Sequence, residues 1–176
     1  TLTKSHKMYP QLPDEDHQLE HLLHLHDRMT DLGFEHYEIS NFAKPGHRAQ
    51  HNLAYWTGKS YLGLGPSAHS FDSTEKKRWK NVSNLHRYGE QLLTGGNAIE
   101  WEEHLTDRQL DLERWMLALR LDDGIPETWL DTDSRRSKVE EMVRRGIMEG
   151  HPGRGGHLRL TPRGFALSDQ VVASLS

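Results

Sequence analysis

Apolar residues in the first quarter of the chain change from helical spacing to strand spacing. Between residues 14 and 32 they recur every three or four positions, which predicts an amphipathic helix that Gly33 can end. Residues 34–42 then predict a strand with Tyr37 and Ile39 on one face. The first two elements are therefore expected to be a helix and a strand.

A loop and a second strand are expected to follow. Residues 43–52 are rich in turn-forming and polar residues, which predicts a loop. The short apolar run 61–64 predicts a buried strand. The order helix, strand, loop, strand is typical of the end of an α/β barrel.

The character of the sequence changes near residue 72. Residues 73–82 are polar and charged and predict a linker or an edge hairpin. Residues 83–93 predict a helix that is closed by glycines at positions 95 and 96. Thr106 and Gln109 have the spacing of a capping box, so the next helix is expected to begin there.

The last seventy residues predict a mostly helical domain. Pro126 opens a short helix, a further helix ends near Gly146, and residues 158–160 alternate like a strand. Thr161 with Pro162 begins a last helix. This order suggests a winged-helix-like domain. The residues expected in its core are Leu112, Trp115, Met116, Leu119, Val139 and Val143.

Together these elements predict an α+β chain in three parts. Residues 1–72 are expected to form the last strands and helices of a (β/α) barrel, and residues 73–82 the connection. Residues 83–176 are expected to form the mostly helical, winged-helix-like domain.

Composition narrows the chemistry that the chain can perform. Its 176 residues include no cysteine, which excludes disulfides, thiol nucleophiles and cysteine-ligated iron–sulfur clusters within it. The formal net charge is −4 with neutral histidines, which argues against a surface built wholly for nucleic acid. Neither a signal peptide nor a run of about 18 apolar residues is present, so a cytoplasmic protein is expected. Peripheral contact with a membrane stays possible.

Residues 37–70 are the densest stretch of candidate chemistry. They concentrate aromatic rings, glycines and histidines, which together offer flat apolar faces, imidazole nitrogens and backbone that a ligand can approach. Pockets and cores are both rich in aromatic residues, so composition alone leaves a binding pocket and a packed barrel edge as equal alternatives.

Two motifs in this stretch resemble a known family. YEISNFAKPGHRAQHNLAYW at residues 37–56 and YLGLGPSAHS at residues 61–70 resemble the radical-SAM family of the heme chaperone HemW and the oxygen-independent coproporphyrinogen III oxidase HemN. MLALRLDDGI at 116–125 and LRLTPRGFALSDQVVASL at 158–175 resemble the family's C-terminal domain. Within this family, the motif HNLAYW resembles the HemW branch.

The resemblance implies cofactors that this chain cannot hold alone. Members of the family bind a [4Fe–4S] cluster and S-adenosyl-L-methionine through an N-terminal CxxxCxxC motif, and this sequence has no cysteine. The chain is therefore expected to be the C-terminal part of a longer protein that binds heme and transfers it to an acceptor protein. By itself it is not expected to be catalytic.

The resemblance also implies a heme-binding element. In relatives HNxxYW is associated with heme, and here it is His51, Asn52, Tyr55 and Trp56. His51 is the expected iron ligand, because a neutral imidazole can bind heme iron. The basic residues before it would meet the propionates; they are Lys44, His47 and Arg48. The alternative is that His51 and Asn52 only cap a turn.

A second implied site follows the expected strand at 61–64. Gly63, Gly65 and His69 belong to GLGPSAH, which in relatives borders the cavity for S-adenosyl-L-methionine and substrate. Glycine allows close approach of backbone to a ligand.

The sequence also allows three further interpretations of its function. The first alternative is a fragment of a true coproporphyrinogen III dehydrogenase rather than of a chaperone. A basic cluster suggests a DNA-recognition helix, although nearby acids favour a solvated face; it comprises Arg135, Arg136, Lys138, Arg144 and Arg145. His17, His21 and His24 share one helix face, which is more typical of a polar surface than of a metal site.

Overall fold

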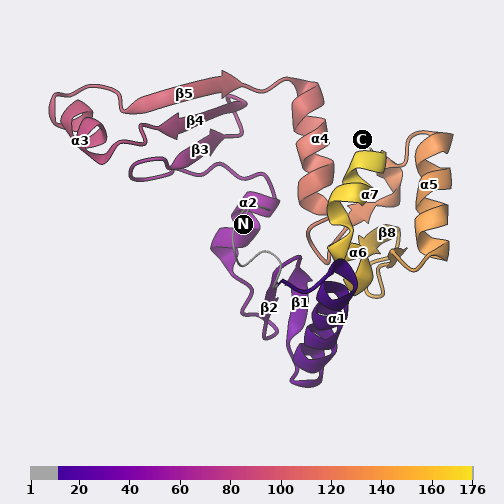
Figure 1. Cartoon of the computed structure of the whole chain (residues 1–176). Helices are drawn as coiled ribbons and strands as arrows, with labels where there is room; N and C mark the ends of the chain where they lie inside the picture. Colours follow the sequence, from indigo (N-terminus) through magenta and orange to yellow (C-terminus); the bar gives the residue numbers. More distant parts are fainter. Residues whose placement is uncertain (1–11, 176) are drawn as a thin grey trace.

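The computed structural model describes residues 12–175, which form an α+β structure with three small antiparallel sheets (Figure 1). One sheet pairs β1 with β2, the second has the order β3-β4-β5, and the third has the order β6-β8-β7. Residues 1–11 of the expected first domain lie outside the described residues. No helix among residues 12–175 has the length and apolar character needed to cross a membrane.

The first helix forms where its spacing predicts. α1 (Glu15–Asp31) begins after Asp14, whose carboxylate accepts a hydrogen bond from the backbone N–H of His17 at 2.9 Å. Such N-caps satisfy an otherwise unpaired helix donor. The helix packs on α6 near the other end of the chain.

The expected single strand over residues 34–42 is wrong, because the chain turns back at its centre. β1 (Glu35–Glu38) and β2 (Asn41–Ala43) form an antiparallel hairpin. The carboxylate of Glu38 is fully buried and accepts hydrogen bonds from the backbone N–H of Ser40 and the side-chain amide of Asn41. These local side-chain bonds hold the turn, and they compete with an extended strand.

The expected loop over residues 43–52 ends earlier than predicted. α2 (Gln50–Trp56) begins at Gln50, so HNLAYW is helical. The expected buried strand at 61–64 is also wrong. Tyr61 forms only an isolated bridge with Phe71, and Leu62 and Leu64 are 69% and 82% exposed.

The connection after residue 68 is a hairpin inside a larger sheet. β3 (His69–Asp72) and β4 (Lys77–Asn81) form the hairpin, and β4 is the central strand. The edge opposite β3 is β5 (Ile99–His104), which the sequence pattern did not predict. α3 (Leu85–Leu93) lies between β4 and β5 in sequence, and together they extend away from the other sheets (Figure 1).

A C-terminal module follows, built on the third sheet and its helices. α4 begins at a capping box in which Thr106 and Gln109 each bond the other's backbone, as the sequence predicts. The elements in order are α4 (Asp107–Ala118), β6 (Ile125–Pro126), the 3-10 helix η2 (Glu127–Trp129), α5 (Asp133–Arg144), β7 (Met148–Gly150), β8 (His157–Leu160), α6 (Pro162–Ala166) and α7 (Ser168–Leu175).

The main hydrophobic core lies within this module. Trp115, Leu119 and Val139 are buried there with residues of β6, β7, β8, α6 and α7. Leu112 and Val143 are 38% and 42% exposed, so their expected place in the core is wrong. Both lie on the outward side of helices whose other side packs inward.

Backbone pairing joins the first part of the chain to the C-terminal module. Ile39 N–H donates to the Arg120 carbonyl at 2.9 Å, and Asp122 N–H donates to the Tyr37 carbonyl at 3.1 Å. The Arg48 guanidinium also binds both carboxylate oxygens of Asp122, at 2.9 and 2.7 Å. The start of α2 is therefore fixed against the segment that follows α4.

Candidate functional site

The helix α2 presents His51 and Tyr55 on one face. They are four residues apart, so they are neighbours along a helix surface. The Tyr55 hydroxyl lies 3.0 Å from Nε2 of His51, and the two rings meet edge to face with centroids 4.9 Å apart. His51 is exposed. Among residues 12–175, its Nδ1 atom has no hydrogen-bond partner.

Aromatic rings continue from Tyr55 toward the second sheet. Tyr55 meets Tyr61 edge to face with centroids 4.5 Å apart, and Tyr61 approaches Phe71 of β3 at 6.3 Å. Burial raises the pKa of the Tyr61 hydroxyl. This row of rings gives α2 an apolar flank that begins at His51.

The other expected residues of HNxxYW lie on a different face of α2. Asn52 and Trp56 are both half-buried, and Trp56 lines a cavity of about 420 Å³. Neither His51 nor Tyr55 lines this cavity. The structure therefore brings His51 together with Tyr55 but separates that pair from Trp56.

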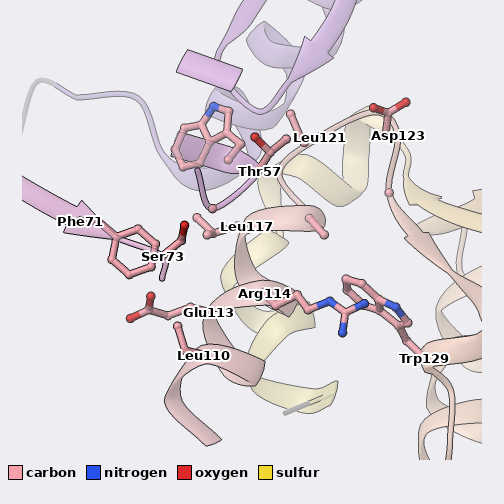
Figure 2. A pocket seen from close by; sticks show the side chains of 14 residues that line it. Thr57, Phe71, Ser73, Leu110, Glu113, Arg114, Leu117, Leu121, Asp123 and Trp129 are labelled. Carbon is pink, nitrogen blue, oxygen red and sulfur yellow. The ribbon is translucent and has the colours of Figure 1, made fainter. Parts of the chain in front are cut away.

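The cavity lies between α2, the β3–β4 hairpin and α4, and Figure 2 shows its lining. Its large apolar residues come from these elements, from η2 and from the segment after α4; they are Trp56, Phe71, Leu110, Leu117, Leu121 and Trp129. The Trp56 indole Nε1 is buried without a hydrogen-bond partner among residues 12–175, and the Arg120 guanidinium lies over its ring at 5.5 Å.

Two of the three basic side chains expected to meet propionates are held by other protein groups. Arg48 pairs with Asp122 and with Glu35, the latter at 3.0 Å. The pKa of Asp122 is nevertheless raised, because burial outweighs the bonds from Arg48. Lys44 binds the Leu32 carbonyl and lies over the ring of Phe34 at 4.3 Å. Of the three, His47 is exposed and has no side-chain partner among the described residues.

The glycine-rich segment at 63–69 is held by hydrogen bonds within the protein. The Asn81 amide donates to the carbonyls of Gly63 and Gly65 at 3.1 and 3.0 Å. Gly65 N–H donates to the Tyr88 hydroxyl at 3.2 Å. A Cβ atom on Gly63 would lie 2.1 Å from the His69 carbonyl oxygen, so glycine is required there for packing. The imidazole of His69 is exposed.

A buried histidine that the sequence did not single out lies within β1. His36 stacks on Phe42 with centroids 4.1 Å apart, and its Nδ1 lies 3.1 Å from Nδ1 of His26. Burial and then the charge of His26 lower the pKa of His36 to about 4. Alternation along β1 could not have indicated this burial, because His36, Tyr37 and Glu38 are buried one after another.

The basic cluster of α5 is largely engaged inside the chain. Arg135 pairs with Asp131 at 2.8 Å, donates to the Leu175 carbonyl and lies over Trp115. Lys138 donates to the Ser174 carbonyl at 2.6 Å, and Arg144 pairs with Glu141 at 2.6 Å.

The histidine row of α1 shows no metal-like grouping. His17 pairs with Asp14 at 2.7 Å. Within residues 12–175 no three histidine or carboxylate side chains are placed to hold a metal ion.

The relatives found by sequence comparison include heme chaperones. The chain is 36% identical to the heme chaperone HemW of Mycobacterium tuberculosis over 164 residues, which is 93% of this chain and 40% of that protein. It is 29% identical to heme chaperone HemW of Escherichia coli over 146 residues, 79% of this chain and 38% of that protein. No family model matches the chain.

A solved structure shares the fold. The coproporphyrinogen III oxidase HemN from Escherichia coli, a radical SAM enzyme, aligns with a TM-score of 0.65 at 17% identity, covering 93% of this chain and 42% of that one. The chain spans about two fifths of the length of these relatives. It belongs to the family of the HemW-type heme chaperones.

Proposed function

We propose that this chain is the C-terminal part of a heme chaperone and that it contacts heme through α2. The longer protein binds heme in the cytoplasm and transfers it to an acceptor protein. Its [4Fe–4S] cluster and S-adenosyl-L-methionine belong to the part of the protein outside this chain. The residues present do not fit a cluster, because none of the 176 is a cysteine.

The observation that carries this proposal is the His51–Tyr55 pair. A histidine that binds a metal usually donates its second ring N–H to an oxygen, which fixes the ring and its tautomer. Here Nε2 of His51 already faces the Tyr55 hydroxyl at 3.0 Å, while Nδ1 is without a partner among the described residues. Iron on Nδ1 would therefore leave the Tyr55 hydrogen bond intact.

The second part of the proposal concerns the porphyrin ring. The rings of Tyr55 and Tyr61 form an apolar flank beside His51, and flat aromatic faces suit a tetrapyrrole. Trp56 lines the cavity on a different face of α2, so it supports that cavity rather than sharing a surface with His51. Asn52 is half-buried beside His51 in the helix and is proposed to hold α2 in place. Gly63, Gly65 and His69 are proposed to border the cofactor cavity of the longer protein.

A titration of hemin and of metal-free protoporphyrin IX tests the iron contact. His51→Ala should shift the Soret band and weaken hemin binding, and it should leave protoporphyrin IX affinity nearly unchanged. Tyr55→Phe keeps the ring but removes the hydroxyl, so it should alter the Soret band less than His51→Ala does. His47→Ala removes an exposed histidine just before α2 and is the matched control.

Two results would contradict the proposal. One is a His51→Ala variant with the spectrum and hemin affinity of the unaltered chain. The other is an equal effect of His47→Ala. Imidazole loses its free lone pair when it is protonated, so hemin binding through His51 should also weaken in acid.

The enzyme alternative, a fragment of a coproporphyrinogen III dehydrogenase, is favoured by the fold shared with HemN. The motif HNLAYW argues against this alternative, because it resembles the HemW branch of the family. Product analysis of the full-length protein with coproporphyrinogen III separates the two, since only the dehydrogenase yields the decarboxylated product.

The DNA-binding alternative rests on the C-terminal module. Its order α4, β6, η2, α5, β7, β8 and its sheet order β6-β8-β7 support a winged-helix-like arrangement. The basic heads of α5 that bind Leu175, Ser174 and Glu141 are unavailable to phosphates without rearrangement. A gel-shift titration across salt tests this alternative, because phosphate-driven binding weakens steeply with salt.

A further inference from the structure

We propose that the cavity beside Trp56 binds a flat, largely apolar anion whose acidic group pairs with Arg114. This site goes beyond the proposed heme contact, because neither His51 nor Tyr55 lines it. Its lining comes from α2, the β3–β4 hairpin, α4 and the segment around η2.

The shape of the cavity favours a small planar molecule. Its volume of about 420 Å³ falls in the range that encloses drug-sized ligands. The rings of Trp56, Phe71 and Trp129 contribute flat walls, and the side chains of Leu110 and Leu117 complete the apolar lining. Figure 2 shows Leu117 between Phe71 and Trp129. Burying an aromatic ring against these walls removes apolar surface from water.

The charge of the cavity favours an anion. The Arg114 guanidinium lies over the Trp129 ring, 3.6 Å from its centroid, and Figure 2 shows the two side chains together. Among residues 12–175, no carboxylate lies within ion-pair distance of Arg114. A stacked guanidinium keeps its edge N–H donors available for a planar acidic group.

The two carboxylates that line the cavity do not cancel this charge, because each has its own cation. Glu113 pairs with Arg78 at 3.0 Å, and Asp123 pairs with Arg154 at 3.7 Å. The positive charge of Arg114 is therefore the one left without a counter-charge among the described lining residues. A ligand with one acidic group and an apolar body matches this arrangement.

Two fluorescent probes of nearly equal shape test the proposal with the 176-residue chain. 8-Anilino-1-naphthalenesulfonate carries an anionic group, and N-phenyl-1-naphthylamine has the same rings without it. Arg114→Gln should weaken the sulfonate probe about fivefold, the scale of one partly exposed charge-assisted hydrogen bond, and should leave the neutral probe unchanged. Leu117→Asn should weaken both probes.

Matched variants make the outcome decisive. Arg108→Gln removes an exposed arginine from the same helix outside the cavity and should bind both probes like the unaltered chain. Arg114→Lys keeps the charge and should retain most of the sulfonate affinity. Circular dichroism checks that each variant is folded.

The proposal is wrong if Arg114→Gln binds the sulfonate probe as tightly as the unaltered chain does. It is equally wrong if Arg114→Gln weakens both probes to the same extent, or if Arg108→Gln has the same effect. The hemin titration of His51 variants does not depend on any of these results, so failure of one proposal leaves the other standing.

Discussion

The Nδ1 atoms of His26 and His36 lie 3.1 Å apart, so one ring donates and the other accepts across the contact between α1 and β1. His36 is 8% exposed and has Phe42 and Phe165 against its faces. A second proton would place two positive imidazoles side by side in a buried site. The pair is therefore stable only when at least one ring is neutral.

This pair predicts a stability that depends on pH. The pKa of His36 is about 4 in the folded chain and near 6.5 in the unfolded one. The unfolded chain thus binds more protons between these values, so stability is complete above about pH 6.5 and falls as pH drops toward 4. The full loss is about 3 kcal/mol. Urea unfolding at several pH values measures it, and His36→Phe should flatten this part of the profile.

Trp115→Ala should cost about 3–5 kcal/mol of unfolding free energy, because it empties a large volume in the main core. Trp115 is 2% exposed and meets the Trp129 ring edge to face at 5.5 Å. Leu112→Ala is the control on the same helix and should cost less than Trp115→Ala, since Leu112 is 38% exposed. Chemical denaturation of both variants measures the difference, and equal losses would show that the inward face of α4 is misplaced.

Substitution of two glycines by alanine should have opposite signs. Gly63→Ala places a Cβ atom 2.1 Å from the His69 carbonyl oxygen, so the backbone must shift and stability should fall by about 1–3 kcal/mol. Gly89 lies inside α3 with open space around it, and Gly89→Ala should add about 0.5–1 kcal/mol. Melting temperatures report both. A neutral Gly63→Ala would mean that the glycine-rich segment relaxes freely.

The Arg48–Asp122 pair should show coupling in a double-mutant cycle. Both bonds are short, and Asp122 is largely buried, so removal of Arg48 alone leaves a carboxylate without its partner. Arg48→Met should cost about 1–3 kcal/mol, and the loss should shrink when Asp122→Leu is already present. Additive losses would mean that the contact between the two side chains adds nothing to the stability of the fold.

Local signals predicted the local structure. The Thr106–Gln109 capping box and the Thr161–Pro162 start of α6 depend on residues within one helical turn, and each begins its helix as the sequence indicates. Leu62 and Leu64 have the apolar character of core residues but are exposed, because no element of the described chain packs over them.

Long-range structure was not visible in the sequence pattern. Acidic residues of β5 pair with lysines of β4, such as Glu102 with Lys77 and Glu100 with Lys80. The sequence of either strand alone does not indicate this pairing. The candidate site was found only in part. HNxxYW was identified, but the loop expectation hid that a helix places His51 beside Tyr55. The cavity was missed because Arg114 and Trp129 join Trp56 only in the folded chain.

The pairing of Ile39 with Arg120 also has a consequence for how the chain folds. Contact between β1 and the end of α4 closes a loop of roughly eighty residues, and loop closure costs conformational entropy before native contacts reward it. Contacts of such long sequence separation slow folding. The C-terminal module, whose strand pairings span fewer residues than this contact, is expected to become protected from hydrogen exchange before β1 does. Pulse-labelling during refolding would therefore show the α2 region, and with it His51, maturing last.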